Sequence, residues 1–216
     1  MIELINISKS YKNQTVLEKV NFFAESDEFN AVMGVSGSGK TTLLRLIAGL
    51  IRPDEGQINI DEKTVDSKEI YVEPFKRSLG YVFQEAALWP HMTVEKNISF
   101  GLVNMEGEKL ERKKTSIMTQ TNIIEYRNKY PNQLSGGQAK RVALARALAP
   151  NPKYILLDEP LTNLDYDARV ELLDLLLHIK EISDVGFVYV SHQKEEIEYL
   201  NSKLWILKSN KLVQNE

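Results

Sequence analysis

The sequence contains no cysteine. A disulfide framework and a thiolate metal site are therefore excluded, and the composition fits a reducing compartment. No apolar run approaches the roughly 20 residues that a helix needs to cross a bilayer. The opening segment, "MIELINISKSYKNQ", has polar residues every few positions, so we expect no signal peptide. Any work at a membrane is therefore expected to depend on partner proteins.

The sequence also lacks an excess of positive charge. Its 216 residues carry a formal net charge of −3, whereas nucleic-acid-binding proteins usually have a strongly basic balance. We therefore expect no nucleic-acid partner. With 43% hydrophobic and 26% charged residues, the composition is ordinary for a soluble globular protein, and the length suits one sizeable domain.

Short apolar segments alternate with amphipathic ones along the chain, which predicts an α/β fold. Predicted strands are 2–11, 16–24, 30–33, 57–60, 79–85, 153–158 and 185–192, and a closing hairpin over 203–214 has its turn at Ser209–Asn210. Predicted helices follow the glycine-rich turn at 34–39, occupy much of 93–128 with interruptions near Gly101 and Gly107, and cover 136–148 and 165–182.

The segment Gly34-Val35-Ser36-Gly37-Ser38-Gly39-Lys40-Thr41 fits the P-loop pattern between a strand and a helix. Its glycines allow the backbone N–H groups to face phosphates. Lys40 can reach the β- and γ-phosphate oxygens, and the Thr41 hydroxyl suits Mg²⁺. An ordinary glycine-rich turn is the alternative, and the flanking strand and helix disfavour it. The sequence predicts a site for ATP and Mg²⁺.

The segment "YILLDEP" delivers Asp158 and Glu159 to the end of an apolar strand, where α/β sheets bind ligands. Asp158 can hold Mg²⁺ through water, and Glu159 can act as general base on an attacking water. Taken alone, the segment could be a strand end with two solvated acids. Beside a P-loop, we interpret it as the metal and catalytic part of the same site.

A second turn, Ser135-Gly136-Gly137-Gln138, leads into a predicted helix. Free N–H groups and the helix dipole make such a turn suited to an anion. The chain therefore carries two predicted phosphate sites.

In this order and spacing, the motifs resemble those of the ATP-binding subunits of ABC transporters over essentially the whole chain. The resemblance implies an α/β P-loop NTPase (ABC ATPase) core with a mixed sheet, an N-terminal antiparallel β subdomain and an α-helical signature subdomain. It implies one ABC ATPase domain over 1–216. The β subdomain and P-loop core would take about 1–87 and 151–216, and the helical subdomain about 88–150.

The resemblance also implies roles for single residues. Tyr11 would stack on adenine, Gln84 would contact Mg²⁺ or water and sense the membrane partner, and His192 would orient water and γ-phosphate. Asp165 would belong to the D-loop. Each has a plainer alternative: Tyr11 as a half-buried strand aromatic, Asp165 as a helix N-cap, Gln84 and His192 as polar strand ends.

Together these inferences give three predicted sets. The catalytic residues are Lys40, Gln84, Glu159 and His192, and the metal ligands are Thr41, Gln84 and Asp158. The nucleotide-binding residues are Tyr11, Gly34, Val35, Ser36, Gly37, Ser38, Gly39, Lys40, Thr41, Thr42, Ser135, Gly136, Gly137, Gln138 and Asp165.

The resemblance accounts for the two phosphate sites. It implies that two copies, or this chain and a homologous subunit, close head to tail. Ser135, Gly136 and Gly137 of one would then hold the γ-phosphate bound to the P-loop of the other. ATP binding would close the dimer, and hydrolysis would loosen it.

The segment Trp89-Pro90-His91-Met92 resembles that of importers of the maltose, polyamine, iron and molybdate type. There it leads into the part that docks on a separate permease, although Trp89 and Met92 could also simply pack the helical core. This resemblance implies a solute-importing ATPase at the cytoplasmic face of a bacterial-type cell membrane.

Three departures keep other functions open. Lys140 stands where the family commonly has glutamine, and Gln193 stands where many relatives have aspartate. The chain ends soon after its predicted hairpin, so we expect no C-terminal regulatory domain. An exporter-type ABC ATPase for lipoproteins or peptides and a soluble non-transport ABC ATPase are the alternatives. A regulatory module without turnover is disfavoured by Glu159 and His192.

Overall fold

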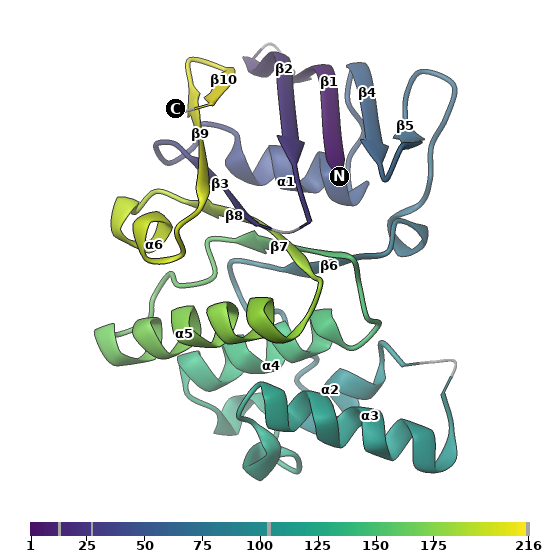
Figure 1. Ribbon diagram of the computed structural model, residues 1–216, viewed down its shortest axis with the longest axis vertical. Helices are drawn as coiled ribbons and strands as arrows, with labels where there is room; N and C mark the ends of the chain where they lie inside the picture. Colours follow the sequence, from purple (N-terminus) through teal and green to yellow (C-terminus); the bar gives the residue numbers. More distant parts are fainter. Residues whose placement is uncertain (13, 27, 103–104, 215–216) are drawn as a thin grey trace.

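The computed structural model describes residues 1–12, 14–26, 28–102 and 105–214 (Figure 1). Its strands are β1 (Ile2–Tyr11), β2 (Gln14–Ala24), β3 (Phe29–Met33), β4 (Glu55–Ile60), β5 (Lys63–Asp66), β6 (Leu79–Val82), β7 (Tyr154–Asp158), β8 (Gly186–Ser191), β9 (Lys203–Lys208) and β10 (Lys211–Gln214). Its α-helices are α1 (Lys40–Ala48), α2 (Val94–Ser99), α3 (Gly107–Gln120), α4 (Gly136–Leu148), α5 (Tyr166–Ile182) and α6 (Lys194–Tyr199). Short 3₁₀ turns are η1 (Pro74–Lys76), η2 (Ile124–Tyr126) and η3 (Pro131–Gln133).

The first strands form an antiparallel sheet in the order β2-β1-β4-β5. Ile2 on β1 pairs with Ala24 on one side and Ile60 on the other. The apolar residues of these strands face α1, which lies beneath the sheet (Figure 1). The predicted N-terminal antiparallel sheet is confirmed.

The second sheet has the order β10-β9-β3-β8-β7-β6. The strands from β9 to β6 run parallel, and β10 pairs with β9 in antiparallel fashion, so the predicted mixed sheet is confirmed. Its central strands are buried along their whole length because both faces are covered. Leu156 and Val188 pack toward α1, whereas Ile155 and Phe187 pack toward α5 and α4.

Helices α2, α3 and α4 enclose a separate apolar cluster that includes Val94, Ile98, Ile117, Met118 and Val142. These helices form the end of the molecule away from the antiparallel sheet (Figure 1). The predicted interruption of the helical segment is confirmed, because α2 ends at Ser99 and α3 begins at Gly107.

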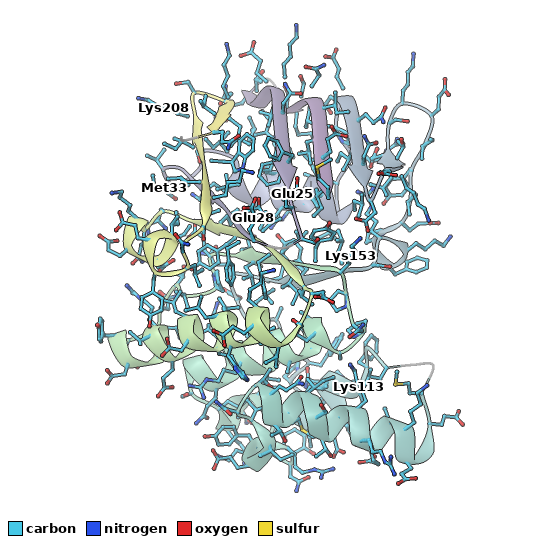
Figure 2. The ribbon with its side chains drawn as sticks, in the orientation of Figure 1. Glu25, Glu28, Met33, Lys113, Lys153 and Lys208 are labelled. Carbon is cyan, nitrogen blue, oxygen red and sulfur yellow. The ribbon has the colours of Figure 1, made fainter. Side chains whose placement is uncertain are left out.

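Charged side chains project from the outside of the ribbon, as Lys113 on α3 and Lys208 on β9 illustrate (Figure 2). Within the described ranges, none of the helices combines the length and apolarity required of a membrane span.

Candidate functional site

The loop 34–39 connects β3 to the first residue of α1. Gly37 and Gly39 adopt φ values of 77° and 108°, which lie in the left-handed region that glycine enters without strain. A Cβ atom on Gly39 would lie 2.7 Å from Val16 Cγ1. The loop conformation therefore depends on glycine at this position.

Lys40 lies inside the curl of this loop, with only 4% of its surface exposed. Its Nζ donates to the carbonyl oxygens of Gly34 at 2.9 Å and Val35 at 3.1 Å. The same ammonium lies 3.3 Å from Glu159 Oε1. The lysine of the P-loop and the acid that follows β7 are thus in direct contact.

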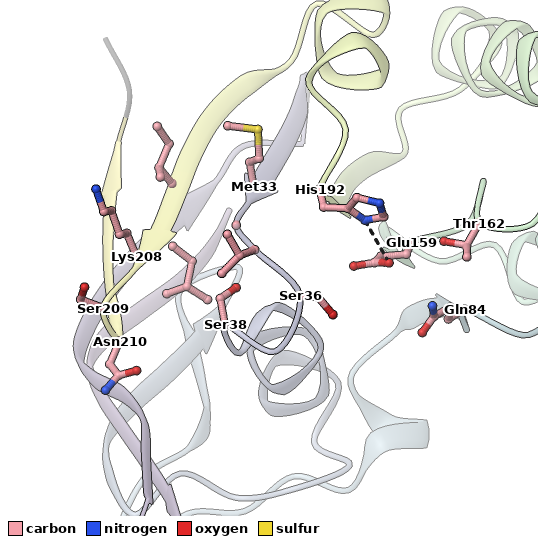
Figure 3. Close-up of a pocket in the computed structure, with 14 residues that line it drawn as sticks. Met33, Ser36, Ser38, Gln84, Glu159, Thr162, His192, Lys208, Ser209 and Asn210 are labelled. Carbon is pink, nitrogen blue, oxygen red and sulfur yellow. Dashed lines mark ion pairs between the residues drawn. The ribbon is translucent and has the colours of Figure 1, made fainter.

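Glu159 also contacts the residue after β8. Its Oε2 lies 3.3 Å from His192 Nδ1, and Figure 3 shows the two side chains facing each other. The Glu159 backbone has a φ of 43°, an uncommon value for a non-glycine residue, and its N–H donates to the Val190 carbonyl at 3.1 Å. Lys40, Glu159 and His192, from three separate segments, therefore form one cluster of ionisable side chains.

Thr41 and Asp158 meet beside this cluster. Thr41 Oγ1 donates to Asp158 Oδ1 at 2.8 Å, and the Tyr81 hydroxyl donates to Asp158 Oδ2 at 3.0 Å. Burial and the neighbouring Asp158 carboxylate raise the pKa of Tyr81 far above its usual range, so the phenol remains a donor. An adjacent hydroxyl and carboxylate are hard oxygen ligands of the type that Mg²⁺ prefers. This donor set fits a magnesium ion.

A cavity of 970 Å³ opens at this edge of the mixed sheet (Figure 3). One wall contains three of the predicted catalytic residues, Gln84, Glu159 and His192, together with Thr162 and residues of the P-loop such as Ser36. The opposite wall is Met33 and residues 206–210 of the β9–β10 hairpin. No sequence motif predicted this second wall, because it depends on β9 pairing beside β3. Thr162 and Tyr81 were not predicted either, although Tyr81 lies in the predicted strand that leads to Gln84.

Other predicted residues lie away from this cavity. Tyr11 ends β1, is 44% exposed, and has Lys9 Nζ 5.7 Å from its ring centroid. Ser135 caps α4: its Oγ accepts from Gln138 N at 3.3 Å, while Ser135 N donates to Gln138 Oε1 at 3.0 Å. Asp165 caps α5 by accepting from Ala168 N at 2.9 Å. The structure thus separates the second predicted phosphate site from the P-loop of the same chain.

The segment after Gln84 is held by two neighbouring helices. Buried Asn97 on α2 donates to the carbonyls of Trp89 and Met92 at 3.2 and 3.1 Å, and accepts from Trp89 N at 2.9 Å. The Trp89 ring lies 4.3 Å from that of Phe100 and 4.8 Å from the guanidinium of Arg146. Trp89, Phe100 and Arg146 also line a surface groove of 350 Å³. Trp89 therefore packs the helical part and borders an open groove at the same time.

The two departures in the motifs both make polar contacts near the site. Lys140 Nζ donates to the carbonyl oxygen of Gln84, and burial lowers the pKa of this ammonium, while Glu85 and Asp158 act in the opposite direction. Gln193 Oε1 accepts from Arg169 on α5 at 2.8 Å. Each departure thus connects a helix to a loop that carries a predicted catalytic residue.

Comparison with known proteins gives a consistent result. Residues 17–162 match the ABC transporter family. The chain is 39% identical to the Fe(3+) ions import ATP-binding protein FbpC of Haemophilus influenzae and 37% identical to the spermidine/putrescine import ATP-binding protein PotA of Bacillus cereus. Each alignment covers 99% of this chain, but the chain spans only 62% and 65% of the lengths of these two relatives.

Two solved structures are similar over nearly their whole length. The dimeric ATP-binding cassette MJ0796, bound to ADP and Pi, is 32% identical with a TM-score of 0.87, and the match covers 100% of this chain and 98% of that one. The cassette cbiO1 of Clostridium perfringens, part of the complex cbiONQ, is 27% identical with a TM-score of 0.87, covering 98% and 86%.

Proposed function

The chain belongs to the ABC transporter family, whose ATP-binding proteins are ATPases, and we propose that it energises solute import through a separate membrane permease. The names of the iron and polyamine relatives, which are importer ATP-binding proteins, support import over the exporter-type and non-transport alternatives. The proposed place of action is the cytoplasmic face of the membrane, where the chain would be held by the permease.

The observation that carries the ATPase part is the contact of Glu159 with both Lys40 and His192. Lys40 can neutralise the β- and γ-phosphate oxygens of ATP at the loop that already surrounds its ammonium. Glu159 lines the cavity, where its carboxylate can take a proton from the attacking water. In this proposal, His192 orients that water and the γ-phosphate.

The proposed magnesium ligands are Thr41 and Asp158, which contact each other, and Gln84, which lines the cavity. When bound, the ion would neutralise charge on the phosphate oxygens. Tyr81 fixes the carboxylate of Asp158 from the other side, so that its orientation is set before any ligand arrives.

A head-to-tail dimer that closes on two ATP molecules is the proposed working form. The separation of Ser135–Gly137 from the cavity of their own chain supports it, because these residues then remain available to a partner's nucleotide. The solved cassettes that resemble this chain include dimers.

Hydrolysis is tested with two variants of the purified chain. Glu159→Gln removes the base but keeps the shape, so we expect ATP turnover to fall by about 10²–10⁴-fold while ATP binding persists. Lys40→Ala removes the phosphate-binding cation, so we expect ATP binding itself to be lost. A turnover rate that is unchanged in Glu159→Gln would contradict the catalytic assignment, and unchanged ATP affinity in Lys40→Ala would contradict the P-loop assignment.

The transport part is tested by affinity purification from gently solubilised membranes of the native host. We expect a polytopic permease to co-purify in stoichiometric amount. Replacing Trp89 and Met92 by alanine should release it, since these residues belong to the segment next to the groove. Tyr199→Ala, which removes a 44% exposed aromatic on α6, is the control and should leave binding intact.

Recovery of an export permease would shift the assignment to the exporter alternative. Recovery with ribosomes, with nucleic acid or alone from the soluble fraction would overturn the transport proposal and leave the ATPase assignment in place.

A further inference from the structure

Lys140 is a buried lysine with an unusual acceptor. It lies on α4, is only 6% exposed, and its ammonium donates to the main-chain carbonyl of Gln84. The side chain of the same Gln84 lines the cavity that contains Glu159 and His192. This hydrogen bond thus connects α4, whose N-cap is Ser135, to a predicted catalytic and metal-binding residue.

Helix α4 holds the following residues of this segment in the same way. Arg146 donates to the carbonyls of Ala86 at 3.1 Å and Ala87 at 2.7 Å. Three carbonyls between residues 84 and 87 therefore accept from two cations of one helix. Of the three acceptor residues, Gln84 lines the cavity and Ala86 and Ala87 do not, so Lys140 makes the contact nearest to it.

A comparison with Lys114 argues against a purely structural role for Lys140. Lys114 is equally buried, at 6% exposure, but its ammonium is paired with Glu95 at 2.7 Å and with Glu111. Within the described ranges Lys140 forms no such direct ion pair, and its ammonium donates instead to the main-chain carbonyl of Gln84. Burying a charge without a paired partner costs free energy, and an apolar side chain could fill the same volume at lower cost.

We propose that Lys140 is a positioning residue for Gln84, fixing its main chain so that the side-chain amide faces the magnesium and water site beside Asp158. This inference rests on the proposed function, because it uses the role proposed for Gln84. It assigns a task to a residue at which the signature segment departs from its family pattern.

The test is a double-mutant cycle of Lys140→Met, Gln84→Ala and the combined variant. We expect Lys140→Met and Gln84→Ala each to raise the Mg²⁺ concentration for half-maximal ATP turnover about tenfold, with the combined variant no worse than Gln84→Ala alone. Binding of a fluorescent ATP analogue, measured in a Glu159→Gln background, supplies a readout without turnover. In this binding experiment Mg²⁺ should increase the affinity for the ATP analogue less than in the parent, and by the same factor in all three variants. The affinity for the analogue in EDTA should stay constant.

Lys140→Gln keeps a donor and is the residue common in the family, so we expect it to restore the Mg²⁺ dependence to within about threefold of the parent chain. Lys114→Met is the matched control: it should lower the melting temperature but leave the Mg²⁺ dependence unchanged.

The outcomes separate the inference from the proposed function. If Gln84→Ala alters the Mg²⁺ dependence but Lys140→Met does not, or if their effects simply add, the inference is overturned and the function stands. If Gln84→Ala itself has no effect, the proposed role of Gln84 fails and the inference fails with it.

Discussion

Asp165 ends the segment "LTNLD" and also begins α5, where its carboxylate accepts a hydrogen bond from the Ala168 N–H at 2.9 Å. The cap explains why an aspartate is favourable here, whatever else the residue does. A D-loop role would need the negative charge as well as the acceptor oxygen. The two roles make different demands on the side chain and can be separated by substitution.

We expect Asp165→Asn to keep the cap, because asparagine and aspartate are comparable N-caps, whereas Asp165→Ala should cost about 1 kcal/mol of unfolding free energy. If the charge serves the catalytic cycle, Asp165→Asn should lower ATP turnover about tenfold or more with an unchanged melting temperature. Calorimetry and a phosphate-release assay measure the two quantities. If Asp165→Asn has the ATP turnover of the parent chain, the negative charge of Asp165 has no role in catalysis, and its function as a helix cap remains.

At the same scale, the sequence predicted chemistry better than it predicted contacts. Local motifs contain Lys40, Asp158 and Glu159, and the spacing within each motif indicates which ligand groups these side chains can contact. In the structure, Lys40 Nζ lies 3.3 Å from Glu159 Oε1. The contact of Tyr81 with Asp158 depends instead on β6 pairing with β7. No local pattern in the sequence gives that pairing.

Elements with a strong apolar pattern were predicted well. The strands β7 and β8, the leucine-rich helix α5 and the hairpin turn at Ser209–Asn210 all occur where the pattern placed them. Strand β5 and helix α6 were missed. Each is short, with 4 and 6 residues, and neither length allows a periodic pattern to become distinct.

The connection from the first sheet to β6 shows a second kind of limit. Buried Arg77 donates to the carbonyls of Leu46 and Ile47 at the end of α1, both at 3.0 Å, and pairs with Asp66 at 2.9 Å. These contacts fix the strand that leads to Gln84 against the helix that begins at the P-loop. The contacts of Arg77 with Leu46 and Ile47 join segments about 30 residues apart, so sequence spacing alone could not indicate them.

The whole molecule presents its two predicted phosphate sites on separate surfaces. The P-loop cavity is lined by Ser36 and Glu159, and Lys40 contacts Glu159 at 3.3 Å. Ser135, the N-cap of α4, is not among the residues that line this cavity. If two chains meet head to tail, each composite site takes a P-loop from one chain and a signature turn from the other. One defective P-loop and one defective signature, on different chains, then leave one intact site.

This arrangement predicts complementation between two defective chains. Lys40→Ala removes the P-loop cation. Gly136→Asp places a carboxylate where a phosphate would bind, and it should fold normally, because a Cβ at Gly136 would lie 3.6 Å from Leu164 Cδ2, an ordinary van der Waals distance. An acid in the first turn of α4 is also favourable to the helix dipole. Gly136→Ala is the control for the added side chain and should behave like the parent.

Since the sequence has no cysteine, a single Lys109→Cys substitution at an exposed position of α3 can carry a fluorescent donor or acceptor. In a Glu159→Gln background, ATP should produce energy transfer when the two defective chains are mixed, because the mixed pair retains one composite site. Neither chain alone should respond, since every site in its own pairs is defective. ATP-driven pairing of Gly136→Asp with itself would show that the signature turn does not contact nucleotide. If ATP produces energy transfer in the parent chain but not in the mixture of the two defective chains, and both variants are folded, the head-to-tail arrangement is contradicted.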